Sequence, residues 1–209
     1  MVYKATDYPK GDVDMSKTLN QKARCFFDIE TSGLNAGEQE ILSLAIVRIE
    51  PDGTRSTYET KVKPVRIERG QKVALEMNAY SDEAWADAPL FSEVAKEVTA
   101  LLRGTVVIGH NVKFDLGFMD AELKIAGASG FSRNEVDTMT LAYEHLAPMG
   151  LESLKLDTIR EFLGWSKDGA HTALFDAETC ERLYNLLAGA GWWTKTKIKF
   201  ARRFKREVK

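Results

Sequence analysis

One stretch, residues 25–34 with the sequence CFFDIETSGL, constrains the fold and the chemistry of this chain more than any other. An apolar run leads into two carboxylates and is then broken by a Ser-Gly pair. Side chains on a β-strand alternate between its faces, so Asp28 and Glu30 share one face and Phe27 and Ile29 the other. Carboxylates fixed side by side repel each other and are costly to desolvate, which a divalent cation offsets. A solvated strand edge is the alternative, because acids are common there.

Two later stretches add further acidic groups. Residues 109–115 read GHNVKFD and follow an apolar strand, and residues 169–177 read GAHTALFDA. Taken alone, Asp115 is explained as a helix-capping acid and Asp176 as an acid in the first turn of a helix. His171 alone is explained as a surface loop histidine, five residues before Asp176 and therefore off the face of the same helix. Each explanation weakens once the three stretches are considered together.

Together these stretches resemble the three exonuclease motifs of the DEDDh family, Asp-x-Glu-[Thr/Ser]-x-Gly-Leu, His-Asn-x-x-Phe-Asp and His-x-Ala-x-x-Asp-Ala. The motifs match in order, and the matched region runs from about residue 25 to residue 187. The resemblance implies an α/β fold of the ribonuclease H-like type, a mixed sheet flanked by helices in a single domain. It also implies two divalent metal ions, Mg²⁺ or Mn²⁺, held by four carboxylates: Asp28, Glu30, Asp115 and Asp176.

His171 is the residue that distinguishes this family from its sister family, which has a tyrosine at that position. An imidazole is a suitable general base for a water molecule at neutral pH. Gly169 and Ala170 favour a loop there, so we expect His171 in a loop that precedes the helix of Asp176. The predicted catalytic set is therefore His171 together with the four carboxylates.

The resemblance further implies where a substrate is bound. The turn with Thr31, Gly33 and Leu34 resembles the family segment that offers backbone groups to the terminal nucleotide and a leucine beneath its base. Gly33 would free the backbone for close approach, and Leu34 fits a core plug equally well. Asn111 and Phe114 match family positions near the substrate, although Phe114 also fits the core face of a helix.

The other histidines and the cysteines are assigned structural roles. His110 follows a buried strand and is expected to hold its end through a hydrogen bond, and His145 is expected to be a solvated helix residue. Cys25 and Cys180, the two cysteines, are expected to be free buried thiols. Free thiols suit a reducing compartment, and we expect the cytoplasm.

Apolar periodicity predicts strands followed by helices that alternate with strands. The expected strands are residues 24–29, 40–50, 54–62 and 106–108. The expected helices are residues 91–102, 113–126, 138–146, 153–163 and 176–187, and a further short helix is expected where Ser81 can act as an N-cap. A Pro-Asp-Gly turn at residues 51–53 should join two antiparallel strands.

Length and composition fit one globular domain with a polar leader and a basic tail. The chain has 209 residues, of which 44% are hydrophobic and 29% charged. No apolar run approaches the ~20 residues that a membrane span requires, so no membrane association is expected. We predict a flexible leader at residues 1–22, an exonuclease domain at residues 23–188 and a basic tail at residues 189–209.

The basic tail contrasts with the rest of the chain, whose net charge is negative. Residues 192–209 carry eight Lys or Arg residues and one Glu, while the net charge of the whole chain is −2. The tail could aid solubility, bind a DNA polymerase or another replication protein, or clamp the nucleic-acid backbone. The interleaved aromatic residues favour the clamp, because Lys and Arg contact phosphates and aromatic rings stack on unpaired bases.

The function predicted from these features is 3′→5′ exonuclease activity that releases nucleoside monophosphates from single-stranded 3′ ends. DNA proofreading or repair trimming is favoured over RNA processing, because we find no evident feature that would read a 2′-hydroxyl. One alternative is an RNase T-like or oligoribonuclease-like enzyme that trims RNA 3′ ends. The other is a degenerate nuclease fold that serves as a binding module, which the retained catalytic residue types oppose.

Overall fold

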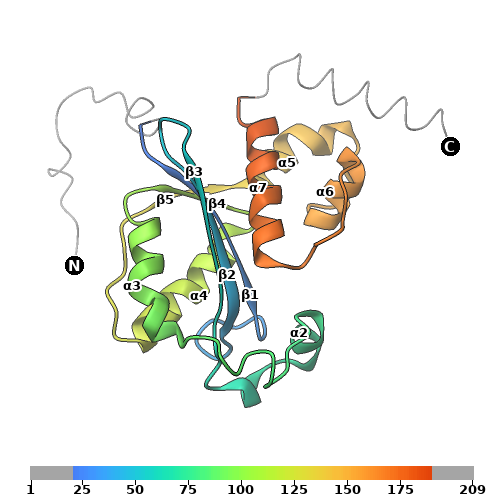
Figure 1. Cartoon of the computed structure of the whole chain (residues 1–209). Coiled ribbons are helices and arrows are strands. Elements are labelled where there is room, and N and C mark those ends of the chain that lie inside the picture. The colour runs from blue at the N-terminus through green and yellow to red at the C-terminus, as the bar shows by residue number, and fades with distance from the viewer. Residues whose placement is uncertain (1–20, 190–209) are drawn as a thin grey trace, which may run out of the picture.

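A computed structural model describes residues 21–189, which form a single mixed sheet covered by helices on both faces (Figure 1). Most of the predicted leader and the basic tail lie outside the described residues. The five strands run in the order β3-β2-β1-β4-β5. Their bounds are β1 Arg24–Thr31, β2 Ile41–Ile49, β3 Arg55–Lys61, β4 Val106–Gly109 and β5 Asn134–Asp137.

The first three strands form the expected antiparallel meander, and β4 and β5 extend it in parallel. The turn between β2 and β3 follows from its sequence: Gly53 has φ +89°, and Asp52 Oδ1 accepts a hydrogen bond from the Thr54 N–H at 2.8 Å. The register places Asp28 opposite Ala45 and Glu30 opposite Ser43. The second strand thus presents only small side chains to the two acids.

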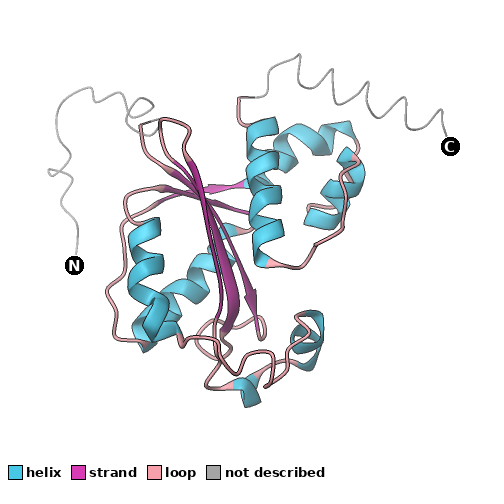
Figure 2. Cartoon of the chain, in the orientation of Figure 1, coloured by secondary structure: helices cyan, strands magenta, loops and turns pink. Residues whose placement is uncertain are grey.

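Helices pack on both faces of the sheet, as Figures 1 and 2 show. Their bounds are α2 Lys72–Met77, α3 Phe91–Leu102, α4 Val112–Ile125, α5 Thr138–Leu146, α6 Leu156–Leu163 and α7 Ala173–Leu187, with short 3-10 turns at Ile67–Arg69 and Ala147–Met149. Helices α3 and α4 cover one face of the sheet, and α7, backed by α5 and α6, covers the other.

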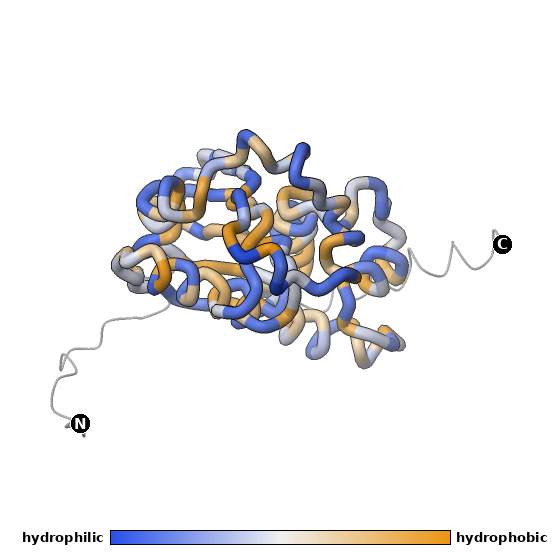
Figure 3. Tube along the Cα trace, turned by 90° about the horizontal axis from the view of Figure 1, so that it is seen from below, coloured by the Kyte–Doolittle hydropathy of each residue, from blue (hydrophilic) through white to orange (hydrophobic). Residues whose placement is uncertain are grey.

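The alternation predicted for β1 is confirmed by the packing of its two faces. Phe27 and Ile29 belong to the core cluster shared with α3 and α4, whereas Phe26 packs with Ala177 and Cys180 of α7. Hydrophilic and hydrophobic residues are interleaved along the chain in Figure 3. The buried apolar residues of α3 and α4 belong to one core cluster, and Ala173, Ala177 and Cys180 of α7 belong to another. Asp28 and Glu30 therefore face the α7 side.

Most expected elements are present, and the main error is the helix capped by Ser81. The short helix is α2, which ends at Met77 ahead of Ser81, while the Ser81 Oγ accepts from the Ala84 N–H in a turn. The serine therefore caps a turn that does not continue as a helix. Strand β5 was not predicted, because its sequence Asn-Glu-Val-Asp has only one β-favouring residue. Both cysteines are free and buried, as expected.

No helix within residues 21–189 is long and apolar enough to cross a membrane.

Candidate active site

Three acids from two elements meet where β1 ends. Asp28 and Glu30 of β1 and Asp176 of α7 each offer a carboxylate oxygen, and these oxygens lie within 4.8 Å of one another. Asp176 reaches the strand because it lies in the first turn of α7, whose Ala173, Ala177 and Cys180 pack on the sheet. The structure thus brings together three of the four carboxylates that were predicted as metal ligands.

Asp115, the fourth predicted acid, approaches from α4 on the other side of β1. Strand β4 pairs with β1 only as far as Phe26, opposite Ile108, so the edge of β1 beyond this point is open to α4. There, Asp115 Oδ1 accepts a hydrogen bond from the Ile29 N–H at 3.2 Å. Asp115 is buried, and its charge acts on Asp28. It therefore lies beside the trio, although it is not one of the three residues within 4.8 Å.

Burial and mutual repulsion disfavour the ionised form of these carboxyl groups. Burial, followed by the charges of Asp115, Asp176 and Glu30, raises the pKa of Asp28 well above its usual range. Burial and the charge of Asp176 raise the pKa of Glu30 to about 7. Burial likewise raises the pKa values of Asp115 and Asp176. An all-oxygen donor set with unfavourable excess negative charge fits a hard divalent cation such as Mg²⁺ or Mn²⁺.

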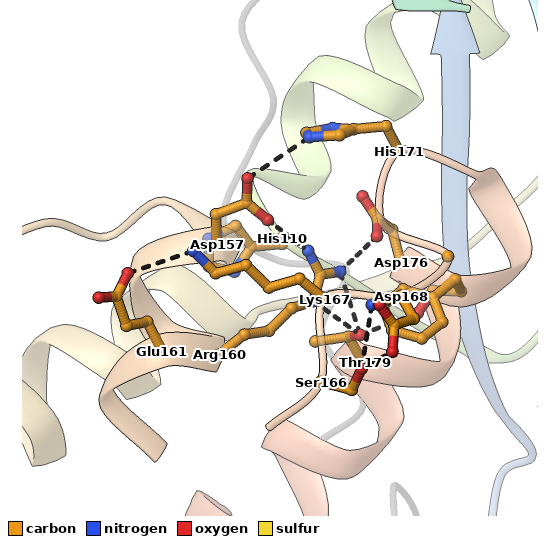
Figure 4. Close-up of polar contacts among 12 residues, drawn as sticks. His110, Asp157, Arg160, Glu161, Ser166, Lys167, Asp168, His171, Asp176 and Thr179 are labelled. Atoms are coloured by element: carbon orange, nitrogen blue, oxygen red, sulfur yellow. Dashed lines mark hydrogen bonds and ion pairs between the residues drawn. The ribbon is translucent and has the colours of Figure 1, made fainter. Parts of the chain in front are cut away.

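A buried arginine holds Asp176 from the side of α6. Arg160 is 1% exposed, and its Nη2 donates a hydrogen bond to Asp176 Oδ1. The same guanidinium donates to Thr179 Oγ1 and, through Nη1, to Asp157 Oδ1 at 2.9 Å (Figure 4). Arg160 moderates the rise in the pKa of Asp176 without cancelling it. Its contacts fix one oxygen of this carboxylate.

His171 lies in the turn before α7, as the sequence predicted. It has φ +65°, a left-handed conformation that is uncommon for a non-glycine residue. Its side chain is half exposed, and its Nε2 lies 3.4 Å from Asp157 Oδ2. A positive charge on His171 would lower the pKa values of Glu30 and Asp176. The imidazole therefore lies close enough to the acidic cluster to interact with it electrostatically.

The turn after β1 is held by close packing, and its leucine is exposed. Thr31 Oγ1 donates to the Gly33 carbonyl at 2.7 Å, and a Cβ at Gly33 would lie 2.5 Å from Gln39 Cγ. Gln39 accepts from the Asn35 N–H, so the glycine is required by the side chain that closes the turn. Leu34 is 69% exposed. The core-plug alternative for Leu34 is therefore wrong.

The second motif supplies both exposed and structural residues. Asn111 has φ +65°, its side chain is exposed, and its backbone N–H donates to Asp137 Oδ1 at 3.0 Å. Phe114 is half buried, with its ring centroid 5.0 Å from that of Phe118, so the core-face alternative applies to at least part of this side chain. His110 holds the strand end, as predicted, through Nδ1 to Thr138 Oγ1 at 2.9 Å.

The sequence reasoning missed Asp157 and Arg160. They lie three residues apart on a helix that was predicted, which is a spacing that brings side chains together. The contact of Arg160 with Asp176 crosses from α6 to α7, and no local pattern indicates it. The expectation for His145 also needs correction, because its Nδ1 is buried and has no hydrogen-bond partner among the described residues.

A pocket opens beside the acidic cluster. It has a volume of about 500 Å³, and its lining includes Glu30, Lys61, Asn78, Trp85 and His171. Asn78 follows α2, and its Nδ2 donates to the Thr31 carbonyl at 3.3 Å. The C-terminal end of α2 is thus tied to the turn that follows β1.

The family of this chain follows from the agreement of the motifs, the fold and a direct family comparison. A family model described as Exonuclease, and named RNase T, matches residues 25–184. The mixed sheet flanked by helices is the ribonuclease H-like arrangement. The chain belongs to this exonuclease family and is a 3′→5′ exonuclease of the DEDDh type.

Two bacterial DNA polymerase III proteins are among its relatives. The subunit epsilon of Treponema pallidum is 28% identical over 161 residues, which are 77% of this chain and 74% of that protein. The PolC-type DNA polymerase III of Caldanaerobacter subterraneus is 30% identical over 158 residues, which are 76% of this chain but 11% of the polymerase.

Solved structures of exonuclease I share the fold. Escherichia coli exonuclease I in complex with a dT13 oligonucleotide matches with a TM-score of 0.68 and 19% identity, over 79% of this chain and 41% of exonuclease I. A second exonuclease I structure, whose description concerns how processivity is achieved, matches with a TM-score of 0.71 and 19% identity, over 85% of this chain and 43% of that protein. The chain thus spans less than half of these enzymes.

Proposed function

We propose that this protein removes nucleoside monophosphates from the 3′ end of single-stranded DNA, in proofreading or repair trimming. The observation that carries the proposal is the convergence of Asp28, Glu30 and Asp176 oxygens within 4.8 Å, with Asp115 beside them. Such a set suits a pair of Mg²⁺ or Mn²⁺ ions. When bound, the ions supply electrostatic stabilisation of the charge that develops on the phosphate and on the leaving oxygen.

The carboxylates and the histidine would have different roles in the reaction. Asp28, Glu30 and Asp176, with Asp115 next to them, would hold the divalent cations against which the scissile phosphate is oriented. His171, in the turn before α7, takes a proton from the attacking water. The retention of all five residue types opposes the alternative in which the fold is only a binding module.

The terminal nucleotide would be bound by the turn after β1 and the start of α4. Leu34 is exposed and free to pack beneath the last base, and Thr31 and Gly33 place backbone groups next to it. Asn111 has an exposed side chain on the α4 side, and the half-buried Phe114 contributes less surface. The adjacent pocket of about 500 Å³ lies in the size range of small-molecule sites.

The preference for DNA is supported by the relatives, which are named as DNA polymerase III proteins, and by the exonuclease I structure with dT13. The direct test uses DNA and RNA strands of one sequence, and a third strand that is DNA except for a 3′-terminal ribonucleotide. We expect the all-DNA strand to be degraded faster than RNA by roughly tenfold or more, because a pocket can reject an added hydroxyl by up to about 10².

The mixed strand shows where the discrimination arises. A delay confined to its first nucleotide would locate the discrimination at the terminal pocket. Equal or faster degradation of the RNA strand would contradict the DNA assignment and favour the alternative of an RNA-trimming enzyme. An inactive protein that still bound both strands would favour the binding module.

The basic tail is proposed to clamp the nucleic-acid backbone. Truncation after Ala190 should leave hydrolysis of short oligonucleotides intact and weaken binding to longer strands. For every phosphate that the tail no longer binds, the slope of log affinity against log salt should decrease by roughly 0.7. An unchanged slope would instead favour a tail that binds a polymerase or another replication protein; the Treponema pallidum relative is named as a subunit of DNA polymerase III.

A further inference from the structure

Four side chains form a continuous polar path from the turn before α7 to the acidic cluster (Figure 4). His171 Nε2 lies 3.4 Å from Asp157 Oδ2, and Asp157 Oδ1 accepts a hydrogen bond from Arg160 Nη1 at 2.9 Å. Arg160 Nη2 then donates to Asp176 Oδ1. The path connects the proposed general base to one carboxylate of the cluster, with Asp157 between the histidine and the arginine.

Arg160 fixes the position of Asp157. Its guanidinium is buried, donates to Thr179 Oγ1 from Nε at 3.3 Å and from Nη2 at 3.1 Å, and lies 4.9 Å from the centroid of the Phe175 ring. A guanidinium is planar with its donors in a fixed fork, so these contacts also set the direction of Nη1. Asp157 is thereby held by Oδ1, and its Oδ2 is left to face His171.

Of the two acids on α6, Asp157 contacts His171 and Glu161 does not. Asp157 lies in the first turn of α6, where the helix dipole alone favours an acid. Glu161, one turn further along, pairs with Lys167 Nζ at 3.2 Å and points away from His171 in Figure 4. A general preference for acids on this helix therefore does not explain why Asp157 contacts His171.

We infer, building on the proposed role of His171, that Asp157 is a positioning residue for this histidine. A carboxylate next to Nε2 favours the tautomer with its proton on Nε2, which leaves the lone pair on Nδ1. Nδ1 takes a proton from the attacking water while the water oxygen bonds to phosphorus. The bond between phosphorus and the 3′ oxygen of the preceding nucleotide breaks, and this oxygen takes a proton from solvent.

A double-mutant cycle of Asp157→Asn and His171→Ala tests whether Asp157 acts through His171. The asparagine keeps the size of the side chain and removes its charge. His171→Ala should lower kcat about 10²–10⁴-fold, and Asp157→Asn should lower kcat roughly tenfold to hundredfold with KM nearly unchanged. In the His171→Ala background, Asp157→Asn should change kcat by less than about twofold, because the group that it positions is absent.

Two controls separate positioning from a general structural effect. Glu161→Gln removes the other α6 acid, which pairs with Lys167, and should leave kcat unchanged. Calorimetric titration of the metal-free protein with Mn²⁺ should give the same affinity for wild type and Asp157→Asn, because Thr179 still holds Arg160 against Asp176. Melting temperatures report whether each variant is folded.

The outcomes distinguish the positioning role from the role of His171 itself. An equal loss of kcat in both backgrounds, or weaker Mn²⁺ binding in proportion to the loss of kcat, would overturn the role of Asp157 and leave His171 as the base. Wild-type kcat in His171→Ala would overturn the proposed base, and the positioning role with it.

Discussion

The backbone N–H of Ile29 donates a hydrogen bond to Asp115 Oδ1 across 3.2 Å, so the acid of the second motif is tied to the strand that carries the first. This contact replaces a strand partner, since β4 ends its pairing with β1 at Phe26. The same carboxylate thus has a structural role and a proposed role in metal binding, and different substitutions can separate the two.

Asp115→Asn and Asp115→Ala should have opposite effects on stability and similar effects on activity. The asparagine oxygen can still accept a hydrogen bond from the Ile29 N–H. The substitution also removes a buried carboxyl group, whose ionisation burial disfavours, as the raised pKa of Asp115 indicates. Its metal-free melting temperature at neutral pH should match or exceed that of wild type. The alanine leaves the Ile29 N–H without an acceptor, which costs about 1–3 kcal/mol of unfolding free energy.

Thermal unfolding and turnover of these two variants provide the measurement. Both should lose turnover by orders of magnitude in Mg²⁺, because a carboxylate of the proposed metal site is missing. An Asp115→Asn variant with near wild-type turnover would show that this carboxylate is structural only.

The stability of the metal-free protein should fall as pH rises. Burial and the charge of Asp176 raise the pKa of Glu30 from 4.5 to about 7, and burial raises that of Asp28. Each such acid has a lower pKa in the unfolded protein than in the folded protein. Between these two pKa values the folded protein binds more protons than the unfolded protein, so the free energy of unfolding decreases as pH rises. For Glu30, this contribution is fully present below about 4.5 and lost as pH rises through about 7.

Melting temperatures of metal-free protein between about pH 5 and about pH 8 check this sign. Saturating Mg²⁺ should reduce the decline, because the cation offsets the ionised carboxylates. Asp28→Asn should also reduce it by removing one charge of the cluster. A melting temperature that rises over this range in wild type, with no effect of Asp28→Asn, would contradict the electrostatic description of the site.

Gly33→Ala should destabilise the turn that follows β1. A Cβ there would lie 2.5 Å from Gln39 Cγ, and Gln39 donates to the Arg69 carbonyl as well as accepting from Asn35. Displacing Gln39 should cost about 1–3 kcal/mol, which is the usual cost of overpacking. Denaturant unfolding of the variant measures this loss.

Gly117→Ala is the matched control. Gly117 lies within α4, and an added Cβ would meet no heavy atom within 4 Å other than those of its chain neighbours and the backbone of its own helix. Alanine in a helix is favoured over glycine by roughly 0.5–1 kcal/mol, so this variant should be slightly stabilised. Similar destabilisation in both variants would show that Gln39 is not the reason for the glycine at position 33.

The parts predicted correctly from sequence are those with local patterns. The period of two in β1 placed Asp28 and Glu30 on one face, and the apolar period of 3.6 gave α3 and α5 with the bounds that the structure has. The placement of His171 ahead of its helix followed from local composition. These features depend on near neighbours in the chain, which the sequence displays directly.

The parts that were missed depend on contacts between elements. Arg160 is one charged residue on a predicted helix, and only the packing of α6 against α7 shows that it contacts Asp176. The exposure of Leu34 could not be decided from a motif that fits both a wedge and a plug. The Ser81 helix was wrong because an N-cap residue also stabilises an isolated turn.

The central claim is that the four carboxylates hold divalent metal ions for 3′→5′ hydrolysis, and degradation of a 5′-labelled single-stranded DNA tests it most directly. Wild type and Asp28→Asn are incubated with the strand in excess chelator, and Mg²⁺ is then added stepwise. We predict no cleavage in chelator, a ladder of products each one nucleotide shorter once Mg²⁺ is in excess, and no ladder from Asp28→Asn. Cleavage by wild type that persists in excess chelator, or an Asp28→Asn variant that degrades the strand at the wild-type rate, would contradict the claim.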